Sequence, residues 1–263
     1  MSLRVGIIGA GQVGERHAVG FAAAEGAAIT GIADVVEERA RGLALRFGGT
    51  PFADWRDMME MGLDVVVVAL PHNDHVQPAL AAAERGAHVL MEKPLATSLR
   101  DGRQIVDACE RAGVKLTLSF AHRFRDEAQF AHRWLAEGKI GVPQVASSVM
   151  NAPRHPGLPG WVTQKEIAGG GVMMYTAIHA VDRLRWLLGT EAERVTAQVR
   201  RWDPRSEVED GAAALLTFAD GGRVPAGAVA TLTANAPPYW AQPAVWDTEI
   251  LGTEGMLRLT REA

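Results

Sequence analysis

Three glycines near the start of the chain have a spacing typical of phosphate binding. Gly9, Gly11 and Gly14 form a G-x-G-x-x-G pattern directly after the apolar run Val5–Ile8. In such a turn the first glycine permits the tight bend, the second lets a pyrophosphate approach the backbone, and the third lets a helix lie close to the strand. The amide-rich start of that helix then faces the phosphates. The pattern therefore predicts a dinucleotide site.

An acidic residue closes the same unit. Residues 4–34 read as strand, glycine turn, helix and second strand, and Asp34 lies 20 residues after the last of these glycines. A carboxylate at the end of the second strand accepts hydrogen bonds from ribose hydroxyls and repels a 2′-phosphate. Val35 and Val36 add no compensating arginine, although Arg39 follows one helical turn later. NAD is therefore favoured over NADP.

A single lysine stands out in a chain that otherwise uses arginine. There are 23 arginines and four lysines, and one of the four lies in Glu92-Lys93-Pro94, directly after a predicted strand. Arginine serves wherever only positive charge is needed, whereas lysine can give up a proton. Lys93 is therefore a candidate for proton transfer, with a solvated loop charge as the alternative.

The first half of the chain alternates strands with helices, which positions these residues. The β-branched run Val65–Leu70 is typical of a strand buried on both faces of a parallel sheet. Residues 1–121 are therefore expected to form an α/β domain, a Rossmann doubly wound parallel sheet. Further strands are expected at 50–52, 88–91 and 115–120, and helices at 37–47, 55–59, 77–85 and 99–112.

The pattern changes after residue 121. Successive strands joined by turns such as Asp220-Gly221-Gly222 predict a largely antiparallel open sheet. Residues 122–263 are therefore expected to form an α+β domain for substrate binding and oligomerisation. Its helices are expected near 126–137 and at 172–188, and its strands at 144–150, 194–200, 211–219, 223–234, 245–251 and 256–259.

The composition excludes several classes of protein. With 263 residues, 48% hydrophobic and 22% charged, the chain has ordinary globular composition. No apolar run is long enough for a membrane span, and we expect no signal peptide because the chain enters a predicted core strand at once. A net charge of −4 without a basic run argues against nucleic acid. The single cysteine, Cys109, excludes an intrachain disulfide. We expect a cytoplasmic protein.

Six motifs lie in order along nearly the whole chain. They are GIIGAGQVGERHA at 6–18, ALPHNDHVQPAL at 69–80, HVLMEKPLA at 88–96, HRF at 122–124, GGGVMMYTAIHAVDRLRWLLG at 169–189 and EILGTEGMLRL at 249–259. In this order and spacing they resemble the Gfo/Idh/MocA family of NAD(P)-dependent oxidoreductases. The resemblance implies a Rossmann domain, a second domain with an open sheet, and hydride exchange between nicotinamide and a carbinol carbon of a sugar, inositol or polyol.

The resemblance also implies a catalytic site. Lys93 and His179 are expected beside the nicotinamide, where a lysine with a pKa lowered by burial, or a histidine near neutrality, exchanges the hydroxyl proton. His179 as a core histidine is the alternative. Asp182 shares its helix face and orients His179 or the substrate, or forms a helix salt bridge. Besides the three glycines, Asp34 and Lys93, the implied cofactor contacts are Gln12, Val13, Leu70, Pro71, His72, Asn73, His75 and Glu92.

Other polar residues complete the expected site. Arg123, Arg154 and Trp161, together with Asp182, are the candidates for substrate contact. No metal is expected, because the candidate ligands lack the spacing of a metal site. These ligands are His72, His75, His122 and His155.

One position departs from the family pattern. Members often carry an aspartate four residues before the histidine, and here that position is Tyr175. The lost carboxylate puts ordinary polyol specificity in question. A tyrosine beside an ammonium group has a lowered pKa and can transfer a proton, so Tyr175 paired with Lys93 is a catalytic candidate. Simple packing is the alternative.

The chain stops at Ala263, soon after the G-T-x-G motif, whereas the family usually continues. Either the chain is a compact subtype, or its sheet exposes apolar surface that a partner subunit buries. Trp202, Trp240 and Trp246 lie on or beside the late strands and suit either a core or an interface. We therefore expect a homo-oligomer joined through the second domain.

Three functions remain open at this point. The first is an NAD-dependent dehydrogenase or reductase acting on a carbinol carbon. The second is a redox-assisted glycoside hydrolase, which would oxidise its substrate transiently and produce no net NADH. The third is a non-catalytic NAD-binding sensor. Net cofactor reduction, turnover with catalytic NAD, and binding alone distinguish them.

Overall fold

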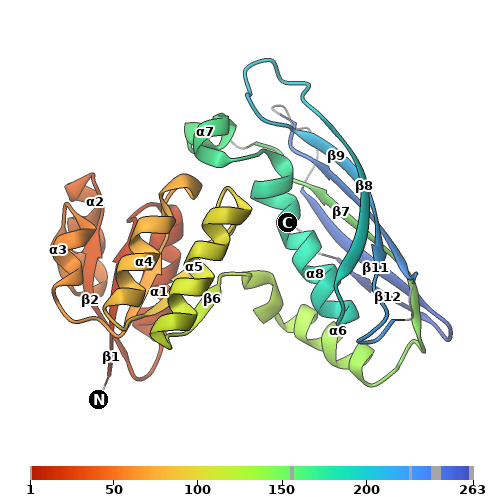
Figure 1. Cartoon of the computed structure of the whole chain (residues 1–263), viewed down its shortest axis with the longest axis horizontal. Helices are drawn as coiled ribbons and strands as arrows, with labels where there is room; N and C mark the ends of the chain where they lie inside the picture. The colour runs from red at the N-terminus through yellow and green to blue at the C-terminus, as the bar shows by residue number, and fades with distance from the viewer. Residues whose placement is uncertain (1, 155–156, 225–226, 238–243, 261–263) are drawn as a thin grey trace. The chain divides into compact units, whose positions relative to one another are not determined.

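The chain folds into two compact units, Met1–Ser119 and Phe120–Ala263 (Figure 1). A computed structural model describes residues 2–154, 157–224, 227–237 and 244–260. The boundary between the units lies two residues before the one expected from the sequence.

A six-stranded parallel sheet forms the first unit, in the order β3-β2-β1-β4-β5-β6. The chain order reverses beside β1, and in such sheets ligands bind outside the carboxyl ends of the strands at that point. This confirms the predicted doubly wound sheet. The strands are β1 (Leu3–Ile8), β2 (Ala27–Ala33), β3 (Thr50–Phe52), β4 (Val65–Val68), β5 (His88–Met91) and β6 (Leu116–Leu118).

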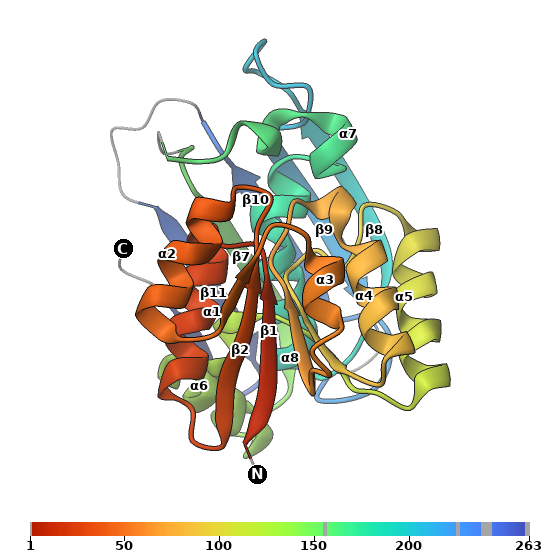
Figure 2. The same cartoon turned by 90° about the vertical axis from the view of Figure 1, so that its left-hand side faces the viewer.

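Helices cover both faces of this sheet, α1 and α2 on one face and α3, α4 and α5 on the other (Figure 2). In β4, Val67 packs into one core cluster, while Val66 and Val68 pack into the other. An unbroken run of valines fits this strand because both of its faces are buried. The helices are α1 (Gln12–Ala23), α2 (Glu37–Phe47), α3 (Trp55–Met59), α4 (Val76–Glu84) and α5 (Leu99–Ala112).

The second unit contains a six-stranded sheet in the order β12-β11-β7-β10-β9-β8. Only β7 and β10 pair in parallel among these strands, and the other four pairs are antiparallel. This confirms the prediction of a largely antiparallel sheet. The strands are β7 (Pro143–Asn151), β8 (Ala192–Arg200), β9 (Gly211–Phe218), β10 (Val229–Asn235), β11 (Val245–Gly252) and β12 (Met256–Leu259).

One face of this second sheet packs against helices α6 and α8. Leu184 and Leu187 of α8 join inward-facing strand residues such as Ala230 and Ile250 in one buried cluster. The helices are α6 (Asp126–Ala136), α7 (Lys165–Ala168) and α8 (Ile178–Leu188), with 3-10 turns at Ala121–Phe124 and Gly160–Thr163. None of the described helices is long and apolar enough to cross a membrane.

Two elements differ from those expected. The helix expected at 172–188 is a π-helical turn, Met173–Ala177, followed by α8. The strand expected at 223–234 begins only at Val229, because the preceding glycines make a tight reversal in which the amides and carbonyls of Gly221 and Val224 bond each other. Alternation of apolar residues does not reveal where such a reversal ends.

Candidate active site

Each glycine of the first turn has a physical reason to be there. Gly9 has a φ of +95°, and a Cβ added to it would lie 2.3 Å from the carbonyl oxygen of Ala69. A Cβ on Gly14 would lie 1.8 Å from the carbonyl oxygen of Gly9. Both are therefore required by the packing of the protein itself. A Cβ on Gly11 would meet nothing within 4 Å, and this open space before α1 fits the pyrophosphate of a dinucleotide.

The first turn of α1 supplies amides for such a group. Gly11 caps the helix, and the amide of Glu15 makes the first intrahelical bond, to the Gly11 carbonyl. The amides of Gln12 and Val13 therefore precede the helical bonding pattern, as at every helix start, where they can bind an anion. Both side chains are exposed. The backbone here has the donors that the predicted cofactor needs.

Asp34 ties the end of β2 to the glycine turn. One carboxylate oxygen accepts from the amide of Ala10 at 2.7 Å, and the other accepts from the amide of Val36 at 2.8 Å. Each carboxylate oxygen keeps a further lone pair that a ribose hydroxyl can use. Asp34 therefore both orients the turn and presents the acceptor expected for NAD.

His75 joins the loops that follow β4 and β5. Its Nε2 lies 3.0 Å from the carbonyl oxygen of Leu70, and its Nδ1 lies 3.0 Å from that of Pro94. The side chain has no exposed surface. Burial lowers the pKa of His75, against the effect of these carbonyls, which favour its protonated form. Its contribution to a cofactor site is therefore to hold two loops together, since the ring itself offers no contact surface.

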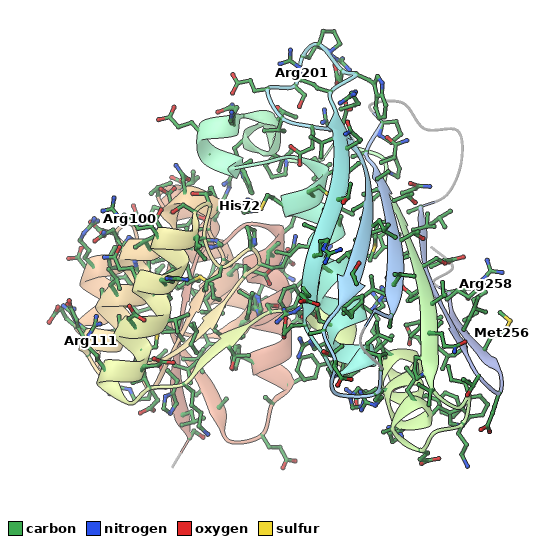
Figure 3. The ribbon with its side chains drawn as sticks, turned by 45° about the vertical axis from the view of Figure 1, so that its right-hand side comes forward. His72, Arg100, Arg111, Arg201, Met256 and Arg258 are labelled. Atoms are coloured by element: carbon green, nitrogen blue, oxygen red, sulfur yellow. The ribbon has the colours of Figure 1, made fainter. Side chains whose placement is uncertain are left out.

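The sequence-predicted residues beside His75 differ in exposure. His72 is 3% exposed and lies in the 3-10 turn after β4 (Figure 3), where its ring centroid is 6.0 Å from that of His75. Asn73 is exposed in the same turn, and Leu70 and Pro71 are partly buried. Asn73 therefore has the side-chain surface that a ligand contact requires.

Lys93 lies in the loop that follows β5 and is partly buried. Loss of water around the ammonium lowers its pKa from 10.5 to about 8, while the neighbouring Glu92 carboxylate opposes this shift. A pKa this close to neutrality suits a group that both takes up and releases a proton. The chemistry of Lys93 is therefore that of the predicted acid-base residue.

His17 of α1 holds the neighbour of Lys93 in place. Its Nε2 lies 2.8 Å from Oε1 of Glu92. Burial alone would raise the pKa of Glu92, but hydrogen bonds from His17 and Ser119 outweigh it and lower that pKa. Sequence reasoning missed His17, although it lies within the first quoted motif. The contact connects the phosphate-facing helix to the loop that carries Lys93.

In the second unit, His179 lies in the first turn of α8 within a group of rings. It is 8% exposed and stacks on His122, with ring centroids 4.2 Å apart and planes 17° from parallel. Phe120 meets it edge-on, and Trp246 lies 6.1 Å away. The sequence did not predict the contact between His122 and His179, because no local pattern relates residues that are 57 positions apart in the chain.

Tyr175 lies in the π-helical turn that precedes α8. Its ring meets that of Trp161 edge-on, with centroids 6.3 Å apart. The structure thus brings together two residues that the sequence proposed separately, one for catalysis and one for substrate contact. Both are partly buried, so each keeps some exposed surface.

Two other predicted substrate residues bind each other. The guanidinium of Arg123 donates two hydrogen bonds, of 2.8 and 2.5 Å, to the carboxylate of Asp182. Asp182 therefore forms a salt bridge, which was one of its expected roles. Its partner comes from the 3-10 turn Ala121–Phe124 and not from the same helix.

Arg154 also has partners within the protein. Its guanidinium donates to Asp203 at 3.3 Å and to Ser206 at 3.2 Å, and its side chain is 15% exposed. Of the three late tryptophans, Trp202 is 67% exposed and Trp246 packs against the core of the unit. Trp240 and His155 lie outside the described residues. Within the described ranges, no three His, Cys, Asp or Glu side chains are grouped as metal ligands would be.

Family models match both units of the chain. Residues 3–120 match a model described as "Oxidoreductase family, NAD-binding Rossmann fold". Residues 128–258 match a model described as "GFO/IDH/MocA C-terminal domain". Together they cover the glycine turn, Lys93 and His179.

Named relatives are oxidoreductases of sugars. D-glucoside 3-dehydrogenase of Escherichia coli is 32% identical over 242 residues, which cover 84% of this chain and 68% of the relative. Levoglucosan dehydrogenase of Pseudarthrobacter phenanthrenivorans is 32% identical over 241 residues, covering 87% of this chain and 62% of that protein. The chain thus spans about two thirds of the length of these curated relatives.

Solved structures agree with this result. A levoglucosan dehydrogenase in complex with NADH and levoglucosan superposes with a TM-score of 0.90 and 28% identity, covering 99% of this chain and 74% of that chain. GenD2 from gentamicin A biosynthesis, in complex with NAD, superposes with a TM-score of 0.89 and 27% identity, covering 98% of this chain and 72% of that chain.

Proposed function

Because the chain belongs to the Gfo/Idh/MocA family of NAD-binding oxidoreductases, we propose that it transfers a hydride between nicotinamide and a carbinol carbon of a sugar, inositol or other polyol. The relatives' substrates support this class, since their names include a glucoside, levoglucosan and myo-inositol. The observation that carries the proposal is Lys93, an amine with a pKa of about 8 at the carboxyl end of β5 in an NAD-binding unit.

NAD would be held at the start of α1 and the end of β2. The open space at Gly11 admits the pyrophosphate, the amides of Gln12 and Val13 donate to it, and Asp34 accepts from the ribose. Bound NAD supplies the hydride acceptor for alcohol oxidation. We place the exposed Asn73 along the nicotinamide ribose, as expected from the sequence.

Lys93 handles the hydroxyl proton in this proposal. In the oxidative direction its neutral amine accepts the proton while the hydride leaves carbon, so the rate rises as the pH passes about 8. In the reductive direction its ammonium donates that proton, so the rate falls over the same range. His179 and Tyr175 belong to the same proposal as further groups that hydrogen-bond the substrate hydroxyls.

A turnover assay with a panel of substrates tests this function. Purified protein would be incubated with NAD and a panel of sugars, anhydrosugars, inositols, linear polyols and hydroxy acids, and the absorbance of reduced nicotinamide followed. We expect reduction with members of one cyclic class and none in Lys93→Met, with Lys115→Met, an exposed lysine of the same unit, as the matched control. Measurable NAD binding without turnover across the panel would contradict the proposal.

We also propose that the chain forms a homo-oligomer through its second sheet. On the face opposite α8, one cross-strand row contains Met256, Leu251, Val145 and Val229, each paired with the next. The first three side chains are 52%, 42% and 43% exposed, and Met256 points away from the sheet (Figure 3). Apolar surface of this kind favours burial against a second copy.

The oligomer can be tested by its mass in solution. Light scattering after size exclusion should give a multiple of 28.2 kDa for the wild type. Val145→Asp should reduce it to the monomer mass, whereas Thr117→Asp, an exposed position on the first sheet, should not. A wild-type monomer would contradict this part. A cytoplasmic location completes the proposal, supported by a single cysteine per chain, which leaves no intrachain disulfide to form.

A further inference from the structure

His122 lies flat against His179. The two ring centroids are 4.2 Å apart, the planes are 17° from parallel, and both side chains are 8% exposed. One face of the His179 ring is therefore covered by another imidazole over a contact distance typical of aromatic stacking. The ring of Phe120, at 80° to that of His179, limits its movement from another side.

Arg183 determines the protonation of His122. Its NH2 group lies 3.1 Å from Nδ1 of His122. A guanidinium can only donate hydrogen bonds, so Nδ1 must be the acceptor, and the proton of the neutral ring is on Nε2. Arg183 is itself held by Thr248, whose hydroxyl accepts from its NH1 group at 3.0 Å. The stacked ring is therefore fixed in place, with its Nδ1 as the acceptor.

We propose that His122 is a positioning residue for His179, an inference that rests on the proposed hydrogen bond from His179 to a substrate hydroxyl. The last side-chain torsion of a histidine is broad, so backbone position alone does not fix the plane of the ring. Stacking on His122 fixes that plane.

The same unit contains a matched control for this arrangement. His132 stacks on Trp186, with ring centroids 4.4 Å apart and planes 14° from parallel. The NH2 group of Arg223 lies 3.2 Å from its Nε2. His132 therefore repeats both contacts of His122, a stacked ring and a guanidinium donor, but its stacked partner is a tryptophan.

Two substitutions separate the stacking from the hydrogen bond. His122→Ala removes the ring, and His122→Phe keeps an aromatic face but removes the Nδ1 acceptor. His132→Ala is the control. Each variant would be measured for kcat and KM on a substrate found in the panel. The His179 ring would be followed by NMR in histidine-labelled protein without substrate, its signal assigned with His179→Asn, and folding checked by circular dichroism.

If His122 positions His179, His122→Ala lowers kcat by about tenfold or more and leaves KM nearly unchanged, because a small misplacement of a reacting group is costly. The His179 signal should split or broaden in His122→Ala, beyond the shift that loss of the stacked ring causes by itself. His122→Phe should restore much of kcat and a single His179 signal, and His132→Ala should change neither.

A single, sharp His179 signal together with an unchanged kcat in folded His122→Ala would overturn the positioning role alone. Equal losses in His132→Ala would also overturn it, since they would indicate general destabilisation. Full activity in His179→Asn would instead overturn the proposed function of His179, whatever the NMR signal shows, so the two failures are distinguishable.

Discussion

Asp182 and Arg123 bind each other through two parallel hydrogen bonds, of 2.8 and 2.5 Å, across 59 residues of sequence. The carboxylate is 3% exposed, whereas the arginine side chain is 36% exposed. Asp182 lies three residues after His179 on α8, so this pair ties the histidine's helix to the 3-10 turn that carries His122. Its first effect is therefore to hold the elements around His179 together.

Asp182→Asn should consequently lower stability. It removes the charge from a buried acceptor that makes two hydrogen bonds to a cation, a loss of about 1–3 kcal/mol in the free energy of unfolding. Glu191→Gln is the control. The Glu191 carboxylate, which pairs with Arg185, is 69% exposed, so this substitution should change stability by less than about 1 kcal/mol. Denaturant unfolding measures both. Equal losses of stability in the two variants would show that burial of the Asp182–Arg123 pair adds nothing to the free energy of unfolding.

Lys93→Met should make the protein more stable at neutral pH. In the folded chain the pKa of Lys93 is about 8, and in the unfolded chain it is 10.5, so protonation at neutral pH favours the unfolded state. This difference corresponds to up to about 3 kcal/mol. This loss of stability is fully present below about pH 8, decreases as the pH rises, and disappears above the pKa of Lys93 in the unfolded chain.

Unfolding of the wild type and Lys93→Met should therefore differ most near neutral pH and least near about pH 10. The exposed Lys115 supplies the control, since Lys115→Met should show no such pH-dependent difference. A Lys93→Met variant less stable than the wild type at neutral pH would mean that the ammonium is held by favourable contacts rather than strained by lost water.

The glycine turn gives a paired test within one helix. Gly14→Ala places a Cβ 1.8 Å from the carbonyl oxygen of Gly9, so the turn must open, and we expect a loss of at least about 2 kcal/mol in stability together with weaker NAD binding. The Cβ added by Gly20→Ala meets nothing within 4 Å, so this substitution should raise the free energy of unfolding by about 1 kcal/mol. Calorimetry measures both. Normal NAD affinity in Gly14→Ala would contradict the assigned turn.

Asp34→Ser should change the choice of cofactor. The substitution removes a charged acceptor that orients the turn through Ala10 and is expected to bind the ribose hydroxyls. NAD affinity should fall by about ten- to a hundredfold, the value of one or two charge-assisted hydrogen bonds, while NADP loses less. Glu37→Gln, an exposed change three residues away, is the control. An unchanged ratio of NAD to NADP affinity would contradict the role of Asp34.

Much of the fold was predictable because its signals are local. The valines of β4 indicated a strand with two buried faces, and Gly9 and Gly14 occupy positions that their own packing requires. The cofactor followed from the glycine turn and Asp34, whereas the family followed from six motifs spread along nearly the whole chain. The unusual lysine usage indicated Lys93, whose lowered pKa agrees with a proton-transfer role.

The remaining features could not be predicted, because they depend on contacts between distant residues. The sequence does not indicate that Arg123 bonds Asp182, that His122 stacks on His179, or that His75 spans two loops. Arg123 and His75 were expected to contact a ligand, and Asp182 was expected to orient His179 or the substrate, or to form a salt bridge within its helix. Polar side chains near a site often form hydrogen bonds with one another. Only the geometry of the folded protein shows which of them can bind a substrate.

Transfer of deuterium from substrate carbon to nicotinamide would show hydride transfer itself. A panel substrate deuterated at its carbinol carbon would be incubated with NAD, and the reduced cofactor analysed by mass spectrometry. We predict one deuterium per reduced nicotinamide, formed in a Lys115→Met control and lost in Lys93→Met. Conversion of the substrate without net deuterated NADH would indicate transient, redox-assisted cleavage, and unlabelled NADH would exclude hydride transfer from that carbon. Either result would contradict the account.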